Sequence, residues 1–486
     1  MSASDLLIDN WIDGQSRPAL SGERLAVHEP ATGKIYAEVA DSAAADVALA
    51  VDAATRAFAQ WSQTPSGERA RLLEALAALI ERDHEALAQA ESRDTGKPID
   101  LARRVDIPRA VANLRFFAAA ATQFASEAHH GAGAGFNVTL RQPLGAVACI
   151  SPWNLPLYLL TWKIAPALAA GNTVIAKPSE ITPRSAALLG ELSREAGFAP
   201  GVLNLVQGSG DRAGQALVEH PQVKAISFTG STATGRRIAA AAAPRLAKLS
   251  LELGGKNPYL IFADADLERA ADTALAAAFT NQGQICLCAS RILIEARAYA
   301  AVREKLIAGM ADWQPADPAL AGTRFGALVS GAHYDKVLAY FDRARAEGGR
   351  IVAGGHALAL AGRNKDGWFV APTLIENLGP DSALNREEIF GPVATLQPFD
   401  DLDHALRLAN ASDYGLAGSV WTGSLAVAQN VAARLECGIV WINTWMTRDL
   451  RTPFGGSKQS GLGREGGLEA MRFFTETRNI CLADPP

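Results

Sequence analysis

The segment Gly145-Ala-Val-Ala-Cys-Ile150 begins the pattern from which the fold class can be predicted. This segment is short and almost entirely apolar, which is typical of a strand buried on both faces of a sheet. Similar segments follow at residues 173–176, 202–206 and 225–228. Helical stretches of about 15 residues separate them, and this alternation predicts a doubly wound parallel α/β sheet.

A second series of apolar segments begins at residue 256 and continues towards the C-terminus. Its members cover residues 256–261, 291–295, 325–328, 350–353, 393–397, 418–422 and 438–443. A chain of 486 residues is too long for one simple core. We therefore expect two doubly wound α/β domains, joined near residue 251.

The sequence just before the first buried strand has a different pattern. Residues 129–135 are rich in glycine, and the alternating sequence Phe136-Asn-Val-Thr-Leu-Arg141 follows them. Strict alternation of polar and apolar residues favours an extended strand. We expect a small β arm here that reaches another subunit.

Composition and charge limit the classes of function. The hydrophobic fraction of 49% and the charged fraction of 20% are those of a soluble globular protein. A net charge of −5 argues against a nucleic-acid partner, which would require a basic patch. Lys163, Pro166, Gly171 and Asn172 interrupt the most apolar run, so it predicts a buried helix and strand and no membrane span.

The N-terminus and the cysteines favour a cytoplasmic location. Residues 1–9 lack the basic segment and apolar core of a signal peptide. Five cysteines are few and odd in number, which fits free thiols in a reducing compartment. Cys286 and Cys288 have no second Cys or His pair at a ligand-like spacing, so we expect no metal site.

We expect the chemistry at Phe279-Thr-Asn-Gln-Gly-Gln-Ile-Cys286-Leu-Cys288-Ala-Ser290. This stretch places Cys286 after a polar turn broken by glycine, between a helical run and a strand. Backbone N–H groups at such a junction can point at a ligand. Taken alone, the stretch also fits a cysteine that is simply a small buried hydrophobe.

Glu252 lies at the end of an apolar strand, directly before Leu-Gly-Gly-Lys256. A glutamate in such a position is unfavourable unless it has a partner or a task. Burial would raise its pKa towards that of a general base. The alternative is a buried salt bridge with Lys177 or Lys256.

Two strand ends carry residues suited to a dinucleotide. Glu180 follows a predicted strand, where a carboxylate can bind the ribose hydroxyls and repel a 2′-phosphate, which favours NAD over NADP. Gly230 and Ser231 follow another strand and open a helix, which suits a pyrophosphate or simply a capped helix start. The glycines of residues 208–214 have the wrong spacing for the dinucleotide fingerprint, so we interpret them as a turn and nothing more.

Seven motifs, in the same order along the chain, resemble those of the aldehyde dehydrogenase superfamily. They are Pro152-Trp-Asn154, Lys177-Pro-Ser-Glu180, Phe228-Thr-Gly-Ser231, Glu252-Leu-Gly-Gly-Lys256, Gly283-Gln-Ile-Cys286, Glu387-Glu-Ile-Phe-Gly-Pro392 and Pro453-Phe-Gly-Gly-Ser-Lys458. The spacing of Glu252 and Cys286 also matches the family's base and nucleophile. The resemblance implies the family's fold, with two doubly wound parallel α/β domains and a small β oligomerisation arm.

The resemblance implies a role for each matching residue. Cys286 would be the nucleophile that adds to the aldehyde carbon, and Glu252 the base that activates water to hydrolyse the thioester. The Asn154 amide and the Cys286 backbone N–H would form the oxyanion hole. The cofactor would be NAD, bound by Trp153, Lys177, Glu180, Gly230, Ser231, Glu388 and Phe390.

The resemblance also implies a division of the chain. Residues 1–122 and 142–251 would form the NAD-binding domain, and residues 252–454 the catalytic domain. Residues 123–141 and 470–486 would be bridging segments that assemble a homodimer or a homotetramer.

A narrower resemblance connects residues 440–481 and Asp106-Ile-Pro-Arg109-Ala with the 2-hydroxymuconic and 2-aminomuconic semialdehyde dehydrogenases. These enzymes act in the degradation of aromatic compounds, and their substrates carry a carboxylate opposite the aldehyde. The resemblance implies that Arg109 and Arg448 bind this carboxylate, which a guanidinium can contact bidentately. Arg451 is a rival for that position, and a salt bridge to a nearby acid is the alternative for either loop arginine. Ser290 stands where these enzymes lead us to expect an acidic residue.

Other functions compete with this one. A betaine aldehyde or another general aldehyde is the main alternative substrate. Transfer of the acyl group to coenzyme A is disfavoured by Glu252, and a non-catalytic binding or structural protein is disfavoured by the intact Cys286, Glu252 and Asn154. The sequence assigns no role to Cys288 and does not separate 2-hydroxy from 2-amino substrates.

Overall fold

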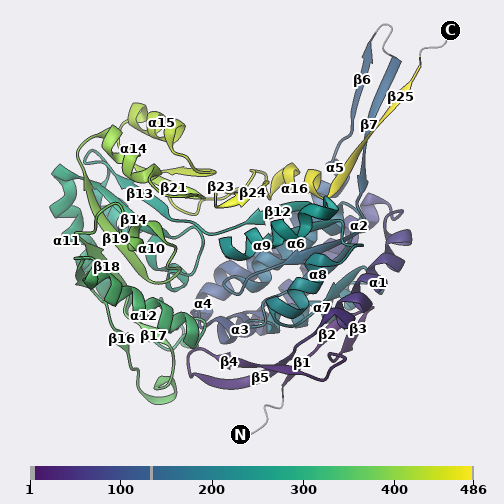
Figure 1. The fold of residues 1–486 in the computed structure, drawn as a ribbon, viewed down its shortest axis with the longest axis horizontal. Coiled ribbons are helices and arrows are strands. Elements are labelled where there is room, and N and C mark those ends of the chain that lie inside the picture. The colour runs from purple at the N-terminus through teal and green to yellow at the C-terminus, as the bar shows by residue number, and fades with distance from the viewer. Residues whose placement is uncertain (1–5, 132–134, 484–486) are drawn as a thin grey trace.

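A computed structural model describes residues 6–131 and 135–483, which form two α/β lobes and a projecting β arm (Figure 1). The N-terminal domain and bridging segments predicted above extend into residues 1–5, 132–134 and 484–486, which lie outside the described residues. Within the described ranges, no helix is long and apolar enough to cross a membrane.

The first lobe is built on an eight-stranded sheet in the order β24-β12-β11-β8-β9-β10-β2-β3. Its parallel strands are β8 (Ala146–Ile150), β9 (Thr173–Lys177), β10 (Leu203–Leu205), β11 (Ala225–Thr229) and β12 (Lys248–Glu252). The antiparallel strands at its edges are β2 (Asn10–Ile12), β3 (Gln15–Arg17) and β24 (Gly461–Leu462). The four buried strands predicted from Gly145 onward are therefore confirmed.

Helices cover both faces of this sheet, because alternate residues of each strand point to opposite sides. One face packs on α1 (Ala44–Trp61), α8 (Gln215–Glu219) and α9 (Thr232–Ala242). The other packs on α2 (Ser66–Arg82), α5 (Ile107–Gln123), α6 (Pro156–Ala169) and α7 (Arg184–Glu195) (Figure 1). This layering is the doubly wound arrangement expected from the sequence.

The second lobe contains a seven-stranded sheet in the order β15-β18-β19-β14-β13-β21-β22. Its parallel strands are β13 (Asn257–Ile261), β14 (Ala289–Glu295), β18 (Thr373–Glu376), β19 (Val393–Phe399), β21 (Ala417–Trp421) and β22 (Ile439–Ile442). The edge strand β15 (Arg350–Ala353) is antiparallel. The covering helices are α10 (Leu267–Phe279), α11 (Tyr299–Gly309), α12 (Gly331–Ala346), α14 (Leu402–Asn410) and α15 (Leu425–Arg434).

One predicted strand of this lobe is wrong. Residues 325–328 do not join the sheet, and Phe325 forms only an isolated bridge with Pro315. The reason is that this segment bonds elsewhere, since the Ala327 N–H donates to the Gly96 carbonyl at 2.9 Å. The fully buried strand β18, which the sequence analysis did not predict, lies between β15 and β19 in this sheet.

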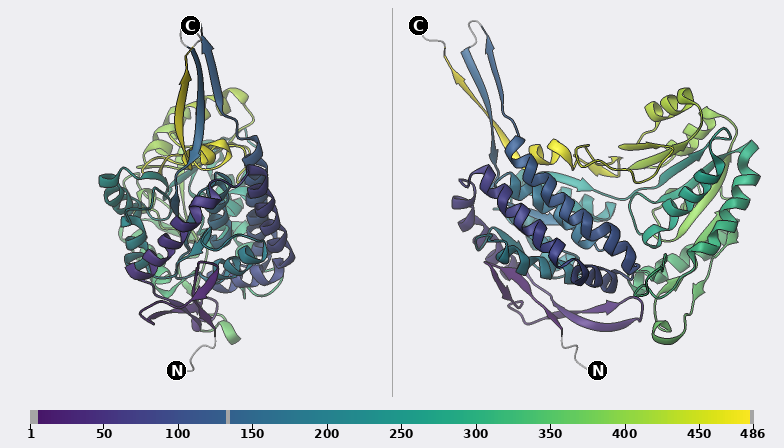
Figure 2. Two further views of the ribbon diagram at one scale, coloured as in Figure 1. Left: turned by 90° about the vertical axis from the view of Figure 1, so that its right-hand side faces the viewer. Right: turned by 180° about the vertical axis from the view of Figure 1, so that it is seen from behind.

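The arm is a three-stranded antiparallel sheet in the order β25-β7-β6 that extends away from both lobes (Figure 2). It consists of β6 (Glu127–Gly131), β7 (Gly135–Pro143) and β25 (Thr475–Leu482). The predicted extended ribbon is therefore present, and its third strand comes from the C-terminal segment. Its role in assembly stays a prediction.

The remaining elements are short or peripheral. The strands are β1 (Leu7–Ile8), β4 (Arg24–Glu29), β5 (Lys34–Ala40), β16 (Ala357–Leu358), β17 (Phe369–Val370), β20 (Tyr414–Gly415) and β23 (Ser457–Lys458). The helices are α3 (His84–Thr95), α4 (Ile99–Leu101), α13 (Ala383–Arg386) and α16 (Gly467–Phe473). A π-helical turn, Ala102–Asp106, joins α4 to α5.

The strand order of the first sheet creates a binding position. From β8 the chain moves to β9 and β10 on one side, whereas β11 and β12 lie on the other side. At such a switch point the connections leave the sheet in opposite directions, which opens a crevice at the carboxyl ends of the strands.

Candidate active site

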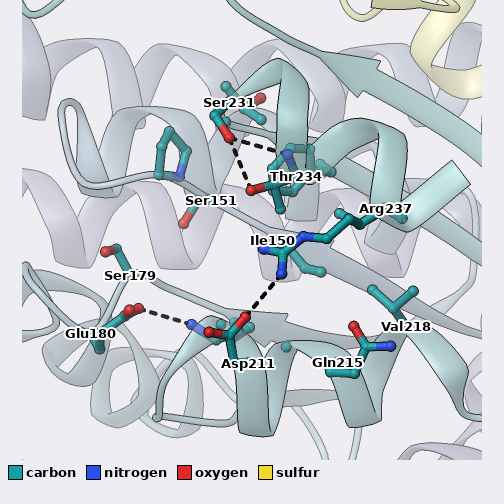
Figure 3. A pocket seen from close by; sticks show the side chains of 18 of the residues that line it. Ile150, Ser151, Ser179, Glu180, Asp211, Gln215, Val218, Ser231, Thr234 and Arg237 are labelled. Carbon is teal, nitrogen blue, oxygen red and sulfur yellow. Dashed lines mark hydrogen bonds and ion pairs between the residues drawn. The ribbon is translucent and has the colours of Figure 1, made fainter. Parts of the chain in front are cut away.

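A groove of about 280 Å³ lies at this crevice. Figure 3 shows side chains from several strand ends pointing into it, among them Ser151, Glu180 and Ser231. Trp153 follows β8, and Lys177 ends β9. The sequence motifs that follow three different strands are thus brought to one site.

Ser231 is both a helix cap and a wall of the groove. Its hydroxyl accepts a hydrogen bond from the Thr234 N–H at 3.2 Å and begins α9, whose positive dipole end therefore faces the groove. A Cβ at Gly230 would lie 2.4 Å from the Phe228 ring, so only glycine fits. The two interpretations of this motif, a capped helix and a phosphate site, are compatible.

Lys177 and Glu180 interact with each other at the far end of the groove. The buried Lys177 ammonium donates to the Glu180 carboxylate at 3.3 Å and to the Pro178 carbonyl at 3.0 Å. The π-helical turn Gly210–Gly214 also lines the groove beside them. Our interpretation of residues 208–214 as a turn and nothing more is therefore wrong, because the glycines form part of the wall.

The groove continues to Cys286. A second cavity of about 250 Å³ shares five lining residues with the first, among them Trp153, Gly230 and Ser231. Pro152 and Thr229 are the other shared residues, and the second cavity alone is lined by Asn154, Leu159, Leu253, Gly254, Cys286, His333, Lys336, Glu388 and Phe390. One continuous channel therefore runs from Glu180 at one end to the Cys286 thiol at the other.

The turn before Cys286 has an unusual backbone. Asn281, Gln282 and Gly283 adopt left-handed φ values of 53°, 57° and 71°. The Asn281 amide holds the turn by donating to the Asn154 carbonyl at 3.1 Å, and the Gln282 amide donates to the Ala327 carbonyl at 2.7 Å. A non-glycine residue in this region is strained and persists only where its surroundings fix it. Here the two hydrogen bonds of Asn281 and Gln282 hold the turn that leads into Cys286.

Cys286 and Cys288 differ in accessibility. Cys286 is partly exposed to the channel, whereas Cys288 is buried. Burial, together with the nearby carboxyls of Glu388 and Glu252, raises the pKa of the Cys286 thiol. Burial raises the pKa of Cys288 as well, to about 12, so it is accessibility and not the pKa that separates the two thiols. The Asn257 amide donates to the Cys286 carbonyl at 2.7 Å and fixes the loop on β13.

Asn154 lines the same cavity as the Cys286 thiol. Its side-chain nitrogen donates one hydrogen bond to the Gln284 carbonyl at 2.8 Å. A primary amide nitrogen carries two N–H groups, so one remains for a ligand. This places a potential donor next to Cys286.

Glu252 is buried at the end of β12, and no described residue forms a hydrogen bond with either of its carboxyl oxygens. Burial, and then the charge of Glu465, raise its pKa well above the usual value for a glutamate. Neither predicted lysine partner is used, since Lys177 contacts Glu180 and no group in the described ranges bonds the Lys256 ammonium. The salt-bridge alternative for Glu252 is therefore wrong.

Space for the Glu252 carboxyl is kept by glycine. A Cβ at Gly455 would lie 2.7 Å from its Oε1 atom. Below it, the Lys163 ammonium pairs with the Glu465 carboxylate at 2.6 Å, and both contact the Ser227 hydroxyl. Glu465 is therefore engaged by Lys163 and is not the partner of a loop arginine.

The channel wall opposite Trp153 comes from the second lobe. The Gly255 N–H donates to the Glu388 carboxyl at 2.8 Å, while burial raises the pKa of Glu388. Phe390 has a left-handed φ of 60°, and its ring lies edge-on to Trp153 with centroids 5.3 Å apart. These contacts hold Glu388 and Phe390 at the channel.

Sequence reasoning missed two residues on α12, His333 and Lys336. The His333 ring lies 5.4 Å from that of Trp153, and its Nε2 bonds the Phe390 carbonyl at 2.7 Å, so Nε2 carries the proton. Burial lowers the pKa of His333 to about 4, which keeps the ring neutral. In the sequence, the spacing of three residues places His333 and Lys336 on one face of a helix. That spacing alone does not connect them with any of the motifs.

The two predicted arginines converge. The Arg448 guanidinium donates to the Tyr158 hydroxyl at 3.0 Å, and both guanidiniums lie 5.6 Å from the Trp162 ring centroid. Burial, and also the charge of Arg448, lower the pKa of Arg109. In the part of the chain that the structure describes, neither arginine forms an ion pair, and Nε and Nη2 of Arg109 are buried without a hydrogen-bond partner.

Arg451 does not join this pair. Its side chain is 80% exposed and binds the Asp449 carboxylate through Nε and Nη2, at 3.0 and 2.6 Å. The salt-bridge alternative therefore holds for Arg451 and not for Arg448. Across residues 6–131 and 135–483, no cluster of three Asp, Glu, His or Cys side chains is arranged to hold a metal.

Comparisons with known proteins agree with this geometry. Residues 17–480 match the model of the aldehyde dehydrogenase family. The chain is similar to 2-aminomuconic semialdehyde dehydrogenase of Danio rerio, with 47% identity over 98% of each chain. It is also similar to 2-hydroxymuconic semialdehyde dehydrogenase of Pseudomonas sp. (strain CF600), with 44% identity over 98% of this chain and 99% of the relative.

A solved structure of indole-3-acetaldehyde dehydrogenase with NAD+ superposes with a TM-score of 0.96 at 37% identity, covering 98% of this chain and 96% of the other. The parallel α/β fold, with a channel that runs from the sheet switch point to Cys286, is shared with these dehydrogenases, a class of oxidoreductase. The chain belongs to the aldehyde dehydrogenase family. The predicted family, fold class and enzyme class are thereby confirmed.

Proposed function

We propose that this enzyme uses NAD to oxidise an anionic semialdehyde to the dicarboxylate, and that its substrate is 2-hydroxymuconic or 2-aminomuconic semialdehyde. The observation that carries the proposal is the pair of guanidiniums, Arg109 and Arg448, which converge without a carboxylate partner among the described residues. The names of the two relatives, at 47% and 44% identity, support the same substrates.

The channel fits NAD. Glu180 and Lys177 would bind the adenosine ribose, because a carboxylate accepts hydrogen bonds from a diol and repels a 2′-phosphate. Gly230 and Ser231 at the start of α9 would hold the pyrophosphate, with Trp153 beside it. The solved indole-3-acetaldehyde dehydrogenase structure contains NAD+, which supports this assignment.

The second cavity would hold the nicotinamide end of the cofactor. Glu388 and Phe390 lie there beside the Cys286 thiol and would position the riboside. When bound, NAD supplies the hydride acceptor that the oxidation requires. The protein's part is to place the aldehyde carbon between that acceptor and the thiol.

Cys286 is the proposed nucleophile. Its sulfur would form a bond with the aldehyde carbon as the thiol loses its proton, since the thiolate is the reactive form. The oxygen of the adduct would receive hydrogen bonds from the free N–H of the Asn154 amide and from the Cys286 backbone N–H. Loss of hydride from this adduct leaves a thioester on Cys286.

Glu252 is the proposed base for hydrolysis. Its raised pKa and unbonded carboxyl oxygens suit a group that must accept a proton from water. The water that gives its proton to Glu252 would add to the thioester carbon. The carbon–sulfur bond would then break, and the Cys286 sulfur would regain a proton to restore the thiol. A coenzyme A acceptor would not need this base.

The arginine pair also argues against the main competing substrate. Betaine aldehyde carries a fixed positive charge, and two guanidiniums near Cys286 would repel it. A distal carboxylate would instead be attracted and bound bidentately. Burial raises the pKa of Cys286 and of Glu252, and the Arg448 charge partly opposes both shifts, which is consistent with its proximity to both groups.

We also propose the functions of the domains that the resemblance implies. The lobe formed by residues 1–122 and 142–251 would bind NAD, and residues 252–454 would carry the catalytic cysteine. Residues 123–141 and 470–486 would be the bridging segments, and the described part of them includes the strands of the projecting arm, whose Phe136, Ile480 and Leu482 are exposed. Such an arm suits assembly into a homodimer or homotetramer, and a small, odd number of cysteines suits a reducing cytoplasm.

The test is a substrate panel with NAD. We expect kcat/KM to be highest for 2-hydroxymuconic and 2-aminomuconic semialdehyde, lower for succinic semialdehyde, and lowest for betaine aldehyde and a neutral aldehyde of muconate length. Arg448→Ala should raise KM for the muconic substrates by roughly 10- to 150-fold, the value of a charge-assisted hydrogen bond. An equal penalty for anionic and neutral aldehydes would make Arg448 structural and remove the substrate proposal.

A further inference from the structure

We propose that Trp162, Tyr158 and Phe454 form an aromatic cradle that holds Arg109 and Arg448 in place of carboxylate partners. Tyr158 is then a positioning residue that determines specificity for anionic aldehydes. This inference rests on the proposed function, because it concerns how the carboxylate-binding pair is held. The cradle is defined by these three aromatic residues throughout.

Trp162 serves both arginines at once. It lies on α6, is only 2% exposed, and presents its ring to each guanidinium at 5.6 Å. A cation near the face of an indole is attracted by the quadrupole of the ring. Because one buried ring contacts both charges, it brings the two guanidiniums together in spite of their repulsion.

Tyr158 and Phe454 complete the arrangement. Tyr158 lies one turn before Trp162, its ring is 5.4 Å from the Arg109 guanidinium, and its hydroxyl accepts the hydrogen bond from Arg448. The Phe454 ring is 4.0 Å from the Arg448 guanidinium. Tyr158 therefore contacts both arginines, through its ring and through its hydroxyl.

Aromatic contacts leave the N–H groups of the two arginines available to bind an anion. A carboxylate partner would neutralise a guanidinium and occupy its N–H groups. A ring face stabilises the positive charge of a guanidinium without occupying any of its N–H groups. The nearest acid on the loop, Asp449, is already bound to Arg451. Arg109 thus keeps two buried N–H-bearing nitrogens without a partner in the described chain.

The cradle is continuous with the reaction centre. Tyr158 and Phe454 belong to the same buried apolar cluster as Leu159, which lines the channel, and Cys286 packs against this cluster. A substrate attached at Cys286 could therefore extend along apolar side chains to the arginines. This layout suits an unbranched, conjugated chain with an aldehyde at one end and a carboxylate at the other.

The test measures the ratio of kcat/KM for 2-hydroxymuconic semialdehyde to that for a neutral aldehyde of similar length. Tyr158→Phe keeps the ring but removes the acceptor hydroxyl, so the ratio should fall about 2- to 12-fold, the range of one hydrogen bond. The change should lie in KM for the anionic substrate. Tyr299→Phe, which removes a hydroxyl bound to Glu376 on the second lobe, is the matched control and should leave the ratio unchanged.

A double-mutant cycle identifies the route of the effect. If Tyr158 acts through Arg448, Tyr158→Phe should change the ratio by less than about 2-fold in the Arg448→Ala background. Additive losses in the double variant would mean that Tyr158 contacts the substrate itself. An unchanged ratio in Tyr158→Phe would mean that the hydroxyl does not position Arg448. Either result would overturn the proposed cradle. Should Arg448→Ala alone leave the ratio unchanged, the proposed function fails instead.

Discussion

Replacement of Glu252 by glutamine should separate the two halves of the reaction. The substitution keeps the size of the side chain but removes its ability to accept a proton. Since no described residue bonds the Glu252 carboxyl oxygens, the change disrupts no contact that holds the fold. We therefore expect formation of the thioester on Cys286 to continue while its hydrolysis stalls.

The magnitude follows from the role of the base. A positioned general base contributes about 10²- to 10⁴-fold to a rate, or roughly 3 to 5 kcal/mol in barrier height. The steady-state kcat of Glu252→Gln should fall by that factor. In a single-turnover experiment about one equivalent of NADH should form per active site and then stop. Intact-mass measurement should find the acyl group on Cys286.

The pH dependence of the native enzyme provides a second readout. Burial and the Glu465 charge raise the pKa of Glu252, so this carboxyl is neutral below that raised pKa and ionised above it. Hydrolysis should therefore increase as the pH rises through the raised pKa and be lost as the pH falls through it. This rise should be absent from the residual activity of Glu252→Gln.

A matched control is Glu469→Gln on α16, where the partly exposed carboxylate pairs, among the described residues, only with Arg472. It should keep native turnover and the native pH profile. Steady-state turnover of Glu252→Gln within a few-fold of the native rate, with no accumulated thioester, would remove Glu252 from the mechanism.

Two further predictions concern the thiols and the cofactor. Cys286→Ala should abolish aldehyde oxidation but retain NAD binding by calorimetry, whereas the buried Cys288→Ala should keep most of the activity; the reverse pattern would exclude Cys286 as nucleophile. The native enzyme should prefer NAD over NADP by at least ~10-fold in kcat/KM, and Glu180→Ala should reduce that preference, because the carboxylate repels a 2′-phosphate. Equal use of both cofactors by the native enzyme would show that Glu180 does not contact the ribose.

The family and the fold class followed from local patterns. Short apolar strands alternating with helices predict a parallel sheet, because buried strands need apolar side chains on both faces. Motifs such as Pro152-Trp-Asn154 and Gly283-Gln-Ile-Cys286 are contiguous in the sequence and were visible without coordinates. Both inferences concern short-range order. The strand predicted at residues 325–328 was wrong because its backbone partners lie at Gly96, far away in the chain.

The sequence by itself therefore determined the family, the doubly wound sheets and the identity of the candidate nucleophile and base. Only the tertiary structure decided which charged groups pair. It assigned Asp449 to Arg451, Glu465 to Lys163 and Lys177 to Glu180. It thereby left Glu252, Arg109 and Arg448 without ionic partners in the described chain. The physical reason is that pairing energies depend on distance and burial, which long-range packing sets and local sequence does not encode.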